Sequence, residues 1–88
     1  MSNEETLIEF PCTFPIKVMG HSGPDIREAI ERAIAEKAET GLPVDIQTRP
    51  SRTGKYMAYT VTCTYQSKAE LDAMYQAFTS IDGVRMVL

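Results

Sequence analysis

The sequence predicts one α+β domain in which a four-stranded antiparallel sheet carries two helices on the same face. Two patterns lead to this prediction. Four segments alternate apolar and polar residues, the period of a half-buried strand, and two longer segments repeat apolar residues every three or four positions, the period of an amphipathic helix. Along the chain these segments follow the order β-α-β-β-α-β. A chain of 88 residues fits a single domain with one core.

The chain is predicted to begin with a flexible arm over residues 1–13, followed by the domain over residues 14–88. The arm carries three glutamates and then Phe10-Pro11, a composition suited to a loosely held terminus. Apolar and polar residues then alternate from Phe14 to Gly20, which predicts the first strand.

The first helix is predicted to start at Gly23-Pro24-Asp25, with Ser22 or Gly23 as its cap. Proline at the first helical position loses no useful N–H, and an early aspartate complements the positive end of the helix dipole. Thr40-Gly41 should end the helix. Its apolar stripe is formed by Ile26, Ala29, Ile30, Ala33, Ile34 and Ala38.

The second and third strands form the next hairpin. Alternation from Val44 to Arg49 predicts the second strand, and Pro50 should end its ladder because proline has no N–H. After a turn at residues 51–54, the third strand runs from Lys55 to about Tyr65. The face predicted to join the core holds Met57, Tyr59, Val61, Cys63 and Tyr65.

A second helix and a short last strand complete the pattern. Ser67 followed by Glu70 forms a capping box, and an apolar stripe follows it. In the last strand, residues 84, 86 and 88 alternate with Arg85 and Val87, which are predicted to lie on the opposite face. Right-handed crossovers place both helices on one side of the sheet, which is the ferredoxin-like βαββαβ arrangement, and leave the other face open.

Composition argues against several classes of function. The net charge of −3 lacks the basic field that most nucleic-acid or membrane-surface binders use. No apolar run approaches the roughly 18 residues of a membrane span. Cys12 and Cys63 are far apart in the sequence, with no CxxC and no paired histidines, so we expect no metal and no cofactor. These observations predict a reduced, cytoplasmic protein.

The residues also argue against an enzyme. His21 is the only histidine, so it would have to serve every general-base role. Acylphosphatase-like catalysis would need an asparagine, and none follows Asn3. An RNA-recognition domain places stacking aromatics two residues apart on the open face, whereas Tyr56 and Tyr59 are three apart and point to opposite faces. RNA binding therefore remains only a third hypothesis.

Basic residues gather on the predicted open face. Strand parity places Lys17, Arg49 and Arg85 there, and Arg52 and Lys55 lie in the adjoining hairpin. These residues are either ordinary solvated charges around a Thr-rich face or a site for an anionic ligand or an acidic partner. The face also holds Met19, Tyr56, Ala58 and Val87, apolar enough for self-association.

The loop from Gly20 to Asp25 is a second candidate. Free N–H groups at the start of the first helix could hold a carboxylate or a phosphate there. Plain helix capping accounts for the same residues.

Several segments resemble the bacterial YbeD family of small proteins of unknown function. They are Phe14 to Gly20, the hairpin with Pro50-Ser51, Gly54 and Tyr56, and the terminal stretch Val84 to Leu88. The similarity runs from about Leu7 to Leu88. It implies a fold similar to the ACT regulatory domains, and by analogy ligand-dependent regulation, with Lys17, Gly20 and Arg85 at matching positions. His21 departs from the family pattern.

Together these observations predict a small, non-enzymatic regulatory module. It would bind a small anionic metabolite, a partner protein such as a metabolic enzyme, or both. The alternative is a structural interaction domain that forms a homodimer through its open sheet face. The candidate ligand-binding residues are Lys17, Gly20, Arg49, Arg52, Lys55 and Arg85.

Overall fold

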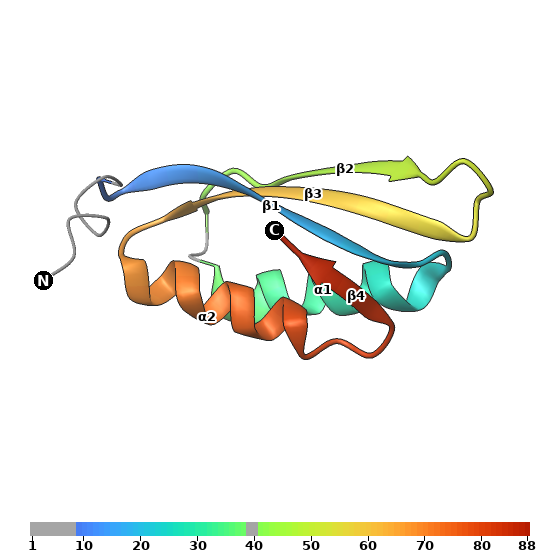
Figure 1. Cartoon of the computed structure of the whole chain (residues 1–88). Coiled ribbons are helices and arrows are strands. Elements are labelled where there is room, and N and C mark those ends of the chain that lie inside the picture. The colour runs from blue at the N-terminus through green and yellow to red at the C-terminus, as the bar shows by residue number, and fades with distance from the viewer. Residues whose placement is uncertain (1–8, 39–40) are drawn as a thin grey trace, which may run out of the picture.

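The computed structural model describes residues 9–38 and 41–88. Within them, the elements follow the predicted order and form a sheet of strand order β2-β3-β1-β4, with every neighbouring pair antiparallel. Both helices lie on the same side of the sheet (Figure 1), which confirms the predicted α+β, ferredoxin-like fold. The elements are β1 Cys12–His21, α1 Pro24–Lys37, β2 Asp45–Pro50, β3 Tyr56–Tyr65, α2 Lys68–Thr79 and β4 Val84–Val87.

The core lies between the helices and the two central strands. Apolar side chains of β1 and β3 point toward the helices at every second position, and each helix buries one stripe against them. The predicted core face of the third strand is confirmed, with Met57 half-buried at its start. The buried residues are Ile16, Val18, Ile26, Ile30, Ala33, Tyr59, Val61, Cys63, Tyr65, Leu71, Met74 and Phe78.

The helix starts follow the local sequence. Gly23 is the N-cap of α1 with a φ of 138°, and no side chain caps this end, because the Ser22 hydroxyl donates instead to the Gly54 carbonyl at 2.6 Å. In α2 the capping box is confirmed: the Glu70 N–H donates to Ser67 Oγ at 3.2 Å. The Glu70 carboxylate accepts from the N–H of Gln66 at 2.8 Å.

Two predicted boundaries differ from the structure. Helix α1 ends at Lys37 and its C-cap, Ala38, is already extended, so the helix stops before Gly41. Strand β1 begins at Cys12, where it pairs with Tyr65, two residues before its predicted start. Residues 1–8 of the predicted arm lie outside the described residues.

A β-bulge reverses the predicted faces of the residues that follow it in β4, Met86 and Val87. Val84 pairs with Gly20 and Met86 with Met19, so Arg85 is the extra residue between them. Val87 therefore lies opposite the buried Val18 and packs against the core. The prediction that Val87 lies on the open face is wrong, because simple alternation does not survive a bulge.

Gly20 accounts for the close approach of β4. A Cβ on Gly20 would lie 2.6 Å from Cδ1 of Ile26, 2.7 Å from the Gly83 carbonyl oxygen and 3.2 Å from Cα of Val84. Only a residue without a side chain lets these groups come together. The structure thus gives Gly20 a packing role.

Candidate functional site

The sheet face that points away from the helices is uncovered by any described element (Figure 1). Strand pairing aligns four residues across this face, one from each strand. In strand order they are Arg49, Ala58, Met19 and Met86. The next row contains Gln47, Thr60 and Lys17. Leu88 completes this row, because its backbone forms two hydrogen bonds with the backbone of Lys17.

Two neighbouring hollows lie over this row, and we call them together the open-face trough. The larger, of about 250 Å³, is lined by Met19, Gly20, Ser51, Tyr56, Arg85 and Met86. The smaller, of about 170 Å³, is lined by Met19, Arg49, Pro50, Ser51, Tyr56, Met57 and Ala58. Because they share Met19, Ser51 and Tyr56, the hollows are parts of one depression. The trough has an apolar floor between Arg49 on β2 and Arg85 in the bulge of β4.

Tyr56 is held firmly at one end of the trough. Its ring stacks on His21 with 5.3 Å between the ring centroids and 29° between the planes. Nζ of Lys55 lies 5.9 Å from the centroid of the same ring. The Tyr56 N–H donates to Ser51 Oγ at 3.1 Å, and its carbonyl accepts from the Ser51 N–H at 2.8 Å. These contacts fix the ring as a preformed wall.

The positive charges around the trough form no ion pair with a described side-chain carboxylate. Lys17, Arg49 and Arg85 are exposed, and none of them forms an ion pair with a described residue. Asp45 shares the open face of β2 with Arg49, but it lies four residues away, about 13 Å along an extended strand. The trough therefore offers unpaired cations beside apolar surface.

The structure brings together part of the predicted site. Arg49 and Arg85 flank the trough, and Lys17 lies two residues before Met19 on the same face of β1. Lys55 contributes through its contact with Tyr56, whereas Arg52 is exposed in the turn and lines neither hollow.

Sequence reasoning missed two features of this surface. Strand alternation predicts Met86 on the core face, and no sequence signal marks the bulge that turns it outward. The pairing of His21 with Tyr56 joins residues far apart in the chain, so no local pattern could show it.

The loop at the start of α1 forms a separate hollow of about 230 Å³. Two carboxylates, Asp25 and Asp82, line it together with His21, Ser22, Gly23, Ile26 and Gly83. The negative charges of these two carboxylates offset the positive end of the helix dipole and would repel an anion in the hollow. This geometry disfavours the carboxylate or phosphate site that the loop suggested.

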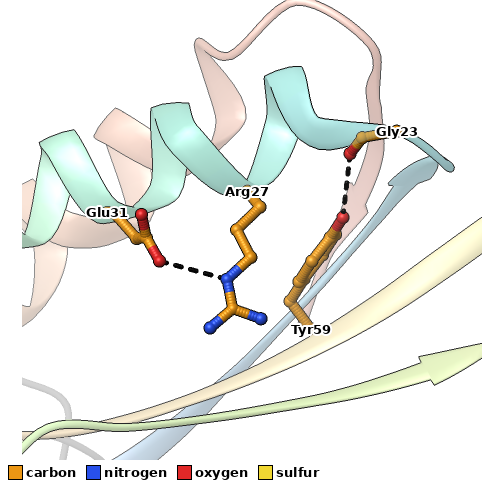
Figure 2. A network of polar contacts seen from close by, with 4 residues as sticks. All are labelled: Gly23, Arg27, Glu31 and Tyr59. Carbon is orange, nitrogen blue, oxygen red and sulfur yellow. Dashed lines mark hydrogen bonds and ion pairs between the residues drawn. The ribbon is translucent and has the colours of Figure 1, made fainter.

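Tyr59 is buried in the core. It is only 2% exposed, and its hydroxyl donates to the Gly23 carbonyl at 3.5 Å beneath the first turn of α1 (Figure 2). Figure 2 also shows Arg27, whose side chain extends away from α1 and whose Nε lies 3.1 Å from a carboxylate oxygen of Glu31 on the same helix. Of the three tyrosines on β3, only Tyr56 faces the open side, which disfavours a base-stacking RNA surface.

The side chains of Cys63 and Tyr65 are buried in the core. Cys63 is 1% exposed, and burial raises the pKa of its thiol. Burial likewise raises the pKa of the Tyr65 hydroxyl. Across residues 9–38 and 41–88, no three His, Cys, Asp or Glu residues are grouped to hold a metal ion. In the same part of the chain, no helix is long and apolar enough to cross a membrane.

Comparison with solved structures supports the fold. The chain is similar to protein HP0495 from Helicobacter pylori, with a TM-score of 0.71 and 17% identity over 100% of this chain and 94% of that one. It is also similar to the ACT domain from GTP pyrophosphokinase of Chlorobium tepidum, with a TM-score of 0.69 and 14% identity over 86% of this chain and 94% of that one. At these identities the similarity shows the fold alone.

Comparison with protein sequences identifies the family. A "UPF0250 protein" of Neisseria gonorrhoeae is 41% identical over 86 residues, covering 98% of this chain and 94% of the relative. A "UPF0250 protein" of Paraburkholderia phytofirmans is 40% identical over 87 residues, covering 99% and 98%. Residues 5–88 match the model of the family described as "Protein of unknown function (DUF493)". These matches agree with the resemblance seen in the sequence, and the chain belongs to the DUF493 family.

Proposed function

We propose that the chain is a non-enzymatic regulatory module that binds an anionic ligand in the open-face trough. The observation that carries this proposal is the apolar floor of the trough, set between Arg49 and Arg85, neither of which forms an ion pair with a described carboxylate. Apolar contact would supply most of the affinity, at about 25 cal/mol per Å² of buried apolar surface. The arginines would select anions and orient them, because guanidinium groups bind carboxylates in a bidentate way.

The rest of the molecule is consistent with a binding role. The sole histidine, His21, stacks on Tyr56, and Cys63 is buried in the core. Among the described residues, the His21 side chain forms no hydrogen bond with a nucleophile or a carboxylate, and the neighbouring Ser22 hydroxyl donates to the Gly54 carbonyl instead. The ACT-like fold supports a regulatory role by analogy only.

An NMR titration tests this proposal. The ¹⁵N-labelled protein is titrated with amino acids, nucleotides, dicarboxylates and acidic peptides, and backbone shifts are followed at Met19, Tyr56 and Met86. A ligand present at about one hundred times its Kd should also raise the free energy of unfolding by about 2.7 kcal/mol. Binding should be lost in an Arg49→Gln, Arg85→Gln double variant.

The matched control is Arg32→Gln, which removes one exposed arginine from α1 on the other side of the sheet. This variant should bind as the original protein does. The proposal fails if no anion in the panel shifts the trough resonances, or if both variants weaken binding equally.

A second candidate function is self-association through the open face. It is favoured by the exposure of two large apolar residues there: Met86 is 50% exposed and Leu88 62%. Light scattering over a range of protein concentrations tests it. A stable dimer that Met86→Lys dissociates, without any response to anions, would replace the regulatory proposal with a structural one.

A further inference from the structure

We infer that the occupant of the open-face trough is an acidic amphipathic helix from a partner protein. This inference rests on the proposed function and names the ligand class of the same site. It predicts a helix whose apolar stripe packs on the floor of the trough and whose carboxylates flank that stripe on both sides.

The width of the trough matches one helix. Arg49 lies on β2 and Arg85 on β4, with β3 and β1 between them. Three spacings of about 4.8 Å between neighbouring strands place the two arginine-bearing strands about 14 Å apart. A helix with its side chains is about 10–12 Å across. A single helix lying along the strands therefore fits between the arginines, with one of them on each flank.

The length of the apolar surface matches two to three helical turns. Along β1, the open face from His21, which pairs with Tyr56, past Met19 to Lys17 covers four residue steps, about 13 Å. At a rise of 1.5 Å per residue, about nine helical residues cover this distance. That length presents apolar anchors at i, i+3, i+4 and i+7, the pattern by which amphipathic helices bind apolar grooves. Leu88, opposite Lys17, extends the apolar surface at that end.

The shape of the trough favours a protein segment over a small metabolite. Its two hollows, of about 250 and 170 Å³, are open depressions on a sheet face, whereas typical small-molecule sites are clefts or cavities that bury most of the ligand surface. Shallow hollows of this size suit side chains that project from a helix already held by a larger contact. Met19 and Met86 supply flexible, polarisable surface that adapts to such side chains.

Charge complementarity selects an acidic helix and argues against a second copy. Two open faces brought together would place the cations Lys17, Arg49 and Arg85 of both chains in one interface, and like charges across an interface are costly. An acidic helix instead pairs with Arg49 on one flank and with Arg85 on the other. The chain's own two helices bury their apolar stripes in its core and are not free to dock there.

The experiment uses synthetic peptides of about 18 residues, long enough for measurable helicity. The first peptide has a leucine stripe at i, i+3, i+4 and i+7 with glutamates on both flanks. In the second, every glutamate is replaced by glutamine. The third has the composition of the first in an order without a stripe. Binding is measured by fluorescence anisotropy and mapped by NMR on the full chain.

We expect the acidic amphipathic peptide to bind and to shift the backbone resonances of Met19, Tyr56 and Met86. The glutamine and reordered peptides should bind at least about tenfold more weakly, as should the first peptide to the Arg49→Gln, Arg85→Gln variant. Arg32→Gln should leave its binding unchanged. Circular dichroism confirms that each variant is folded.

The two proposals fail in different ways. If a small anion shifts the trough resonances while the acidic peptide does not bind, the helix inference is overturned and the proposed function stands. If neither binds, both are overturned. Equal binding of the acidic and glutamine peptides would refute the charge argument, and displacement of the peptide by self-association at high protein concentration would identify a second copy as the occupant.

Discussion

Replacing Gly20 with alanine tests how closely β1, β4 and α1 are packed. The added Cβ would lie 2.6 Å from Cδ1 of Ile26 and 2.7 Å from the carbonyl oxygen of Gly83. The isoleucine methyl is the end of a flexible side chain and can move. The Gly83 oxygen is backbone, so it can move only if β4 shifts away from β1.

The expected cost lies in the upper part of the range for overpacked sites. Such substitutions destabilise by about 1–3 kcal/mol, and a rigid backbone contact favours a loss of about 2–3 kcal/mol here. For a domain of this size, that loss lowers the midpoint of thermal unfolding by about 10–20 °C. Thermal and urea unfolding followed by circular dichroism measure both quantities.

A double-variant cycle separates the two contacts. Ile26→Val removes Cδ1 and alone should cost about 0.5–1.5 kcal/mol. The Gly20→Ala, Ile26→Val double variant should lose about 1 kcal/mol less free energy of unfolding than the sum of the two single losses, because the contact with Cδ1 of Ile26 is gone. Gly54→Ala is the matched control. Gly54 has a φ of 78°, and a Cβ added there would meet no atom within 4 Å, so Ile26→Val should not rescue this variant.

The packing argument would be refuted by a Gly20→Ala protein whose thermal midpoint stays within about 2 °C of the original. It would also be refuted if Ile26→Val rescued both glycine variants equally, since that would indicate a general effect of the smaller side chain.

Three further predictions concern the core and a helix end. Because burial raises the pKa of the Cys63 thiol and the Tyr65 hydroxyl, the unfolded chain loses these protons at lower pH than the folded protein. The contribution of these two groups to the free energy of unfolding should therefore be constant below about pH 8 and fall as the pH rises through about 9–11. In urea titrations, a Cys63→Ala, Tyr65→Phe variant should lose stability less steeply over that range. An aromatic disulfide reagent at neutral pH should modify the half-buried Cys12 before Cys63, whose labelling should require urea, and equal rates in native buffer would contradict the burial of Cys63. Ser67→Ala removes the acceptor of the Glu70 N–H and should cost about 1 kcal/mol in thermal unfolding, whereas an unchanged midpoint would show that the cap is not needed.

Local patterns predict the helices and strands because each of these elements is determined largely by a short stretch of sequence. The stripe of α1, the Ser67 capping box and the alternation of β3 all depend on residues within one helix or one strand. The face of β4 could not be predicted in this way. It depends on the bulge at Arg85, which forms where Gly20 allows a close approach from another part of the chain.

The candidate site shows the same division. Strand parity is enough to place Lys17 and Arg49 on the open face. The outward position of Met86 and the stacking of His21 on Tyr56 follow from pairings between distant segments. A sequence without its pairing register therefore identifies the charges of the trough but only part of its apolar surface.

The two sides of the trough lie on opposite edge strands of the sheet, β2 and β4, and these strands are synthesised at different times. Its flanking arginines, Arg49 and Arg85, lie on the second and the last strand of the chain and come together only after β4 docks on β1. During synthesis on the ribosome, a nascent chain that lacks β4 has Arg49 and Tyr56 but no opposite wall. The complete trough therefore forms only once β4 is in place, and under the proposed function a partner that binds the trough would distinguish molecules with β4 from truncated ones.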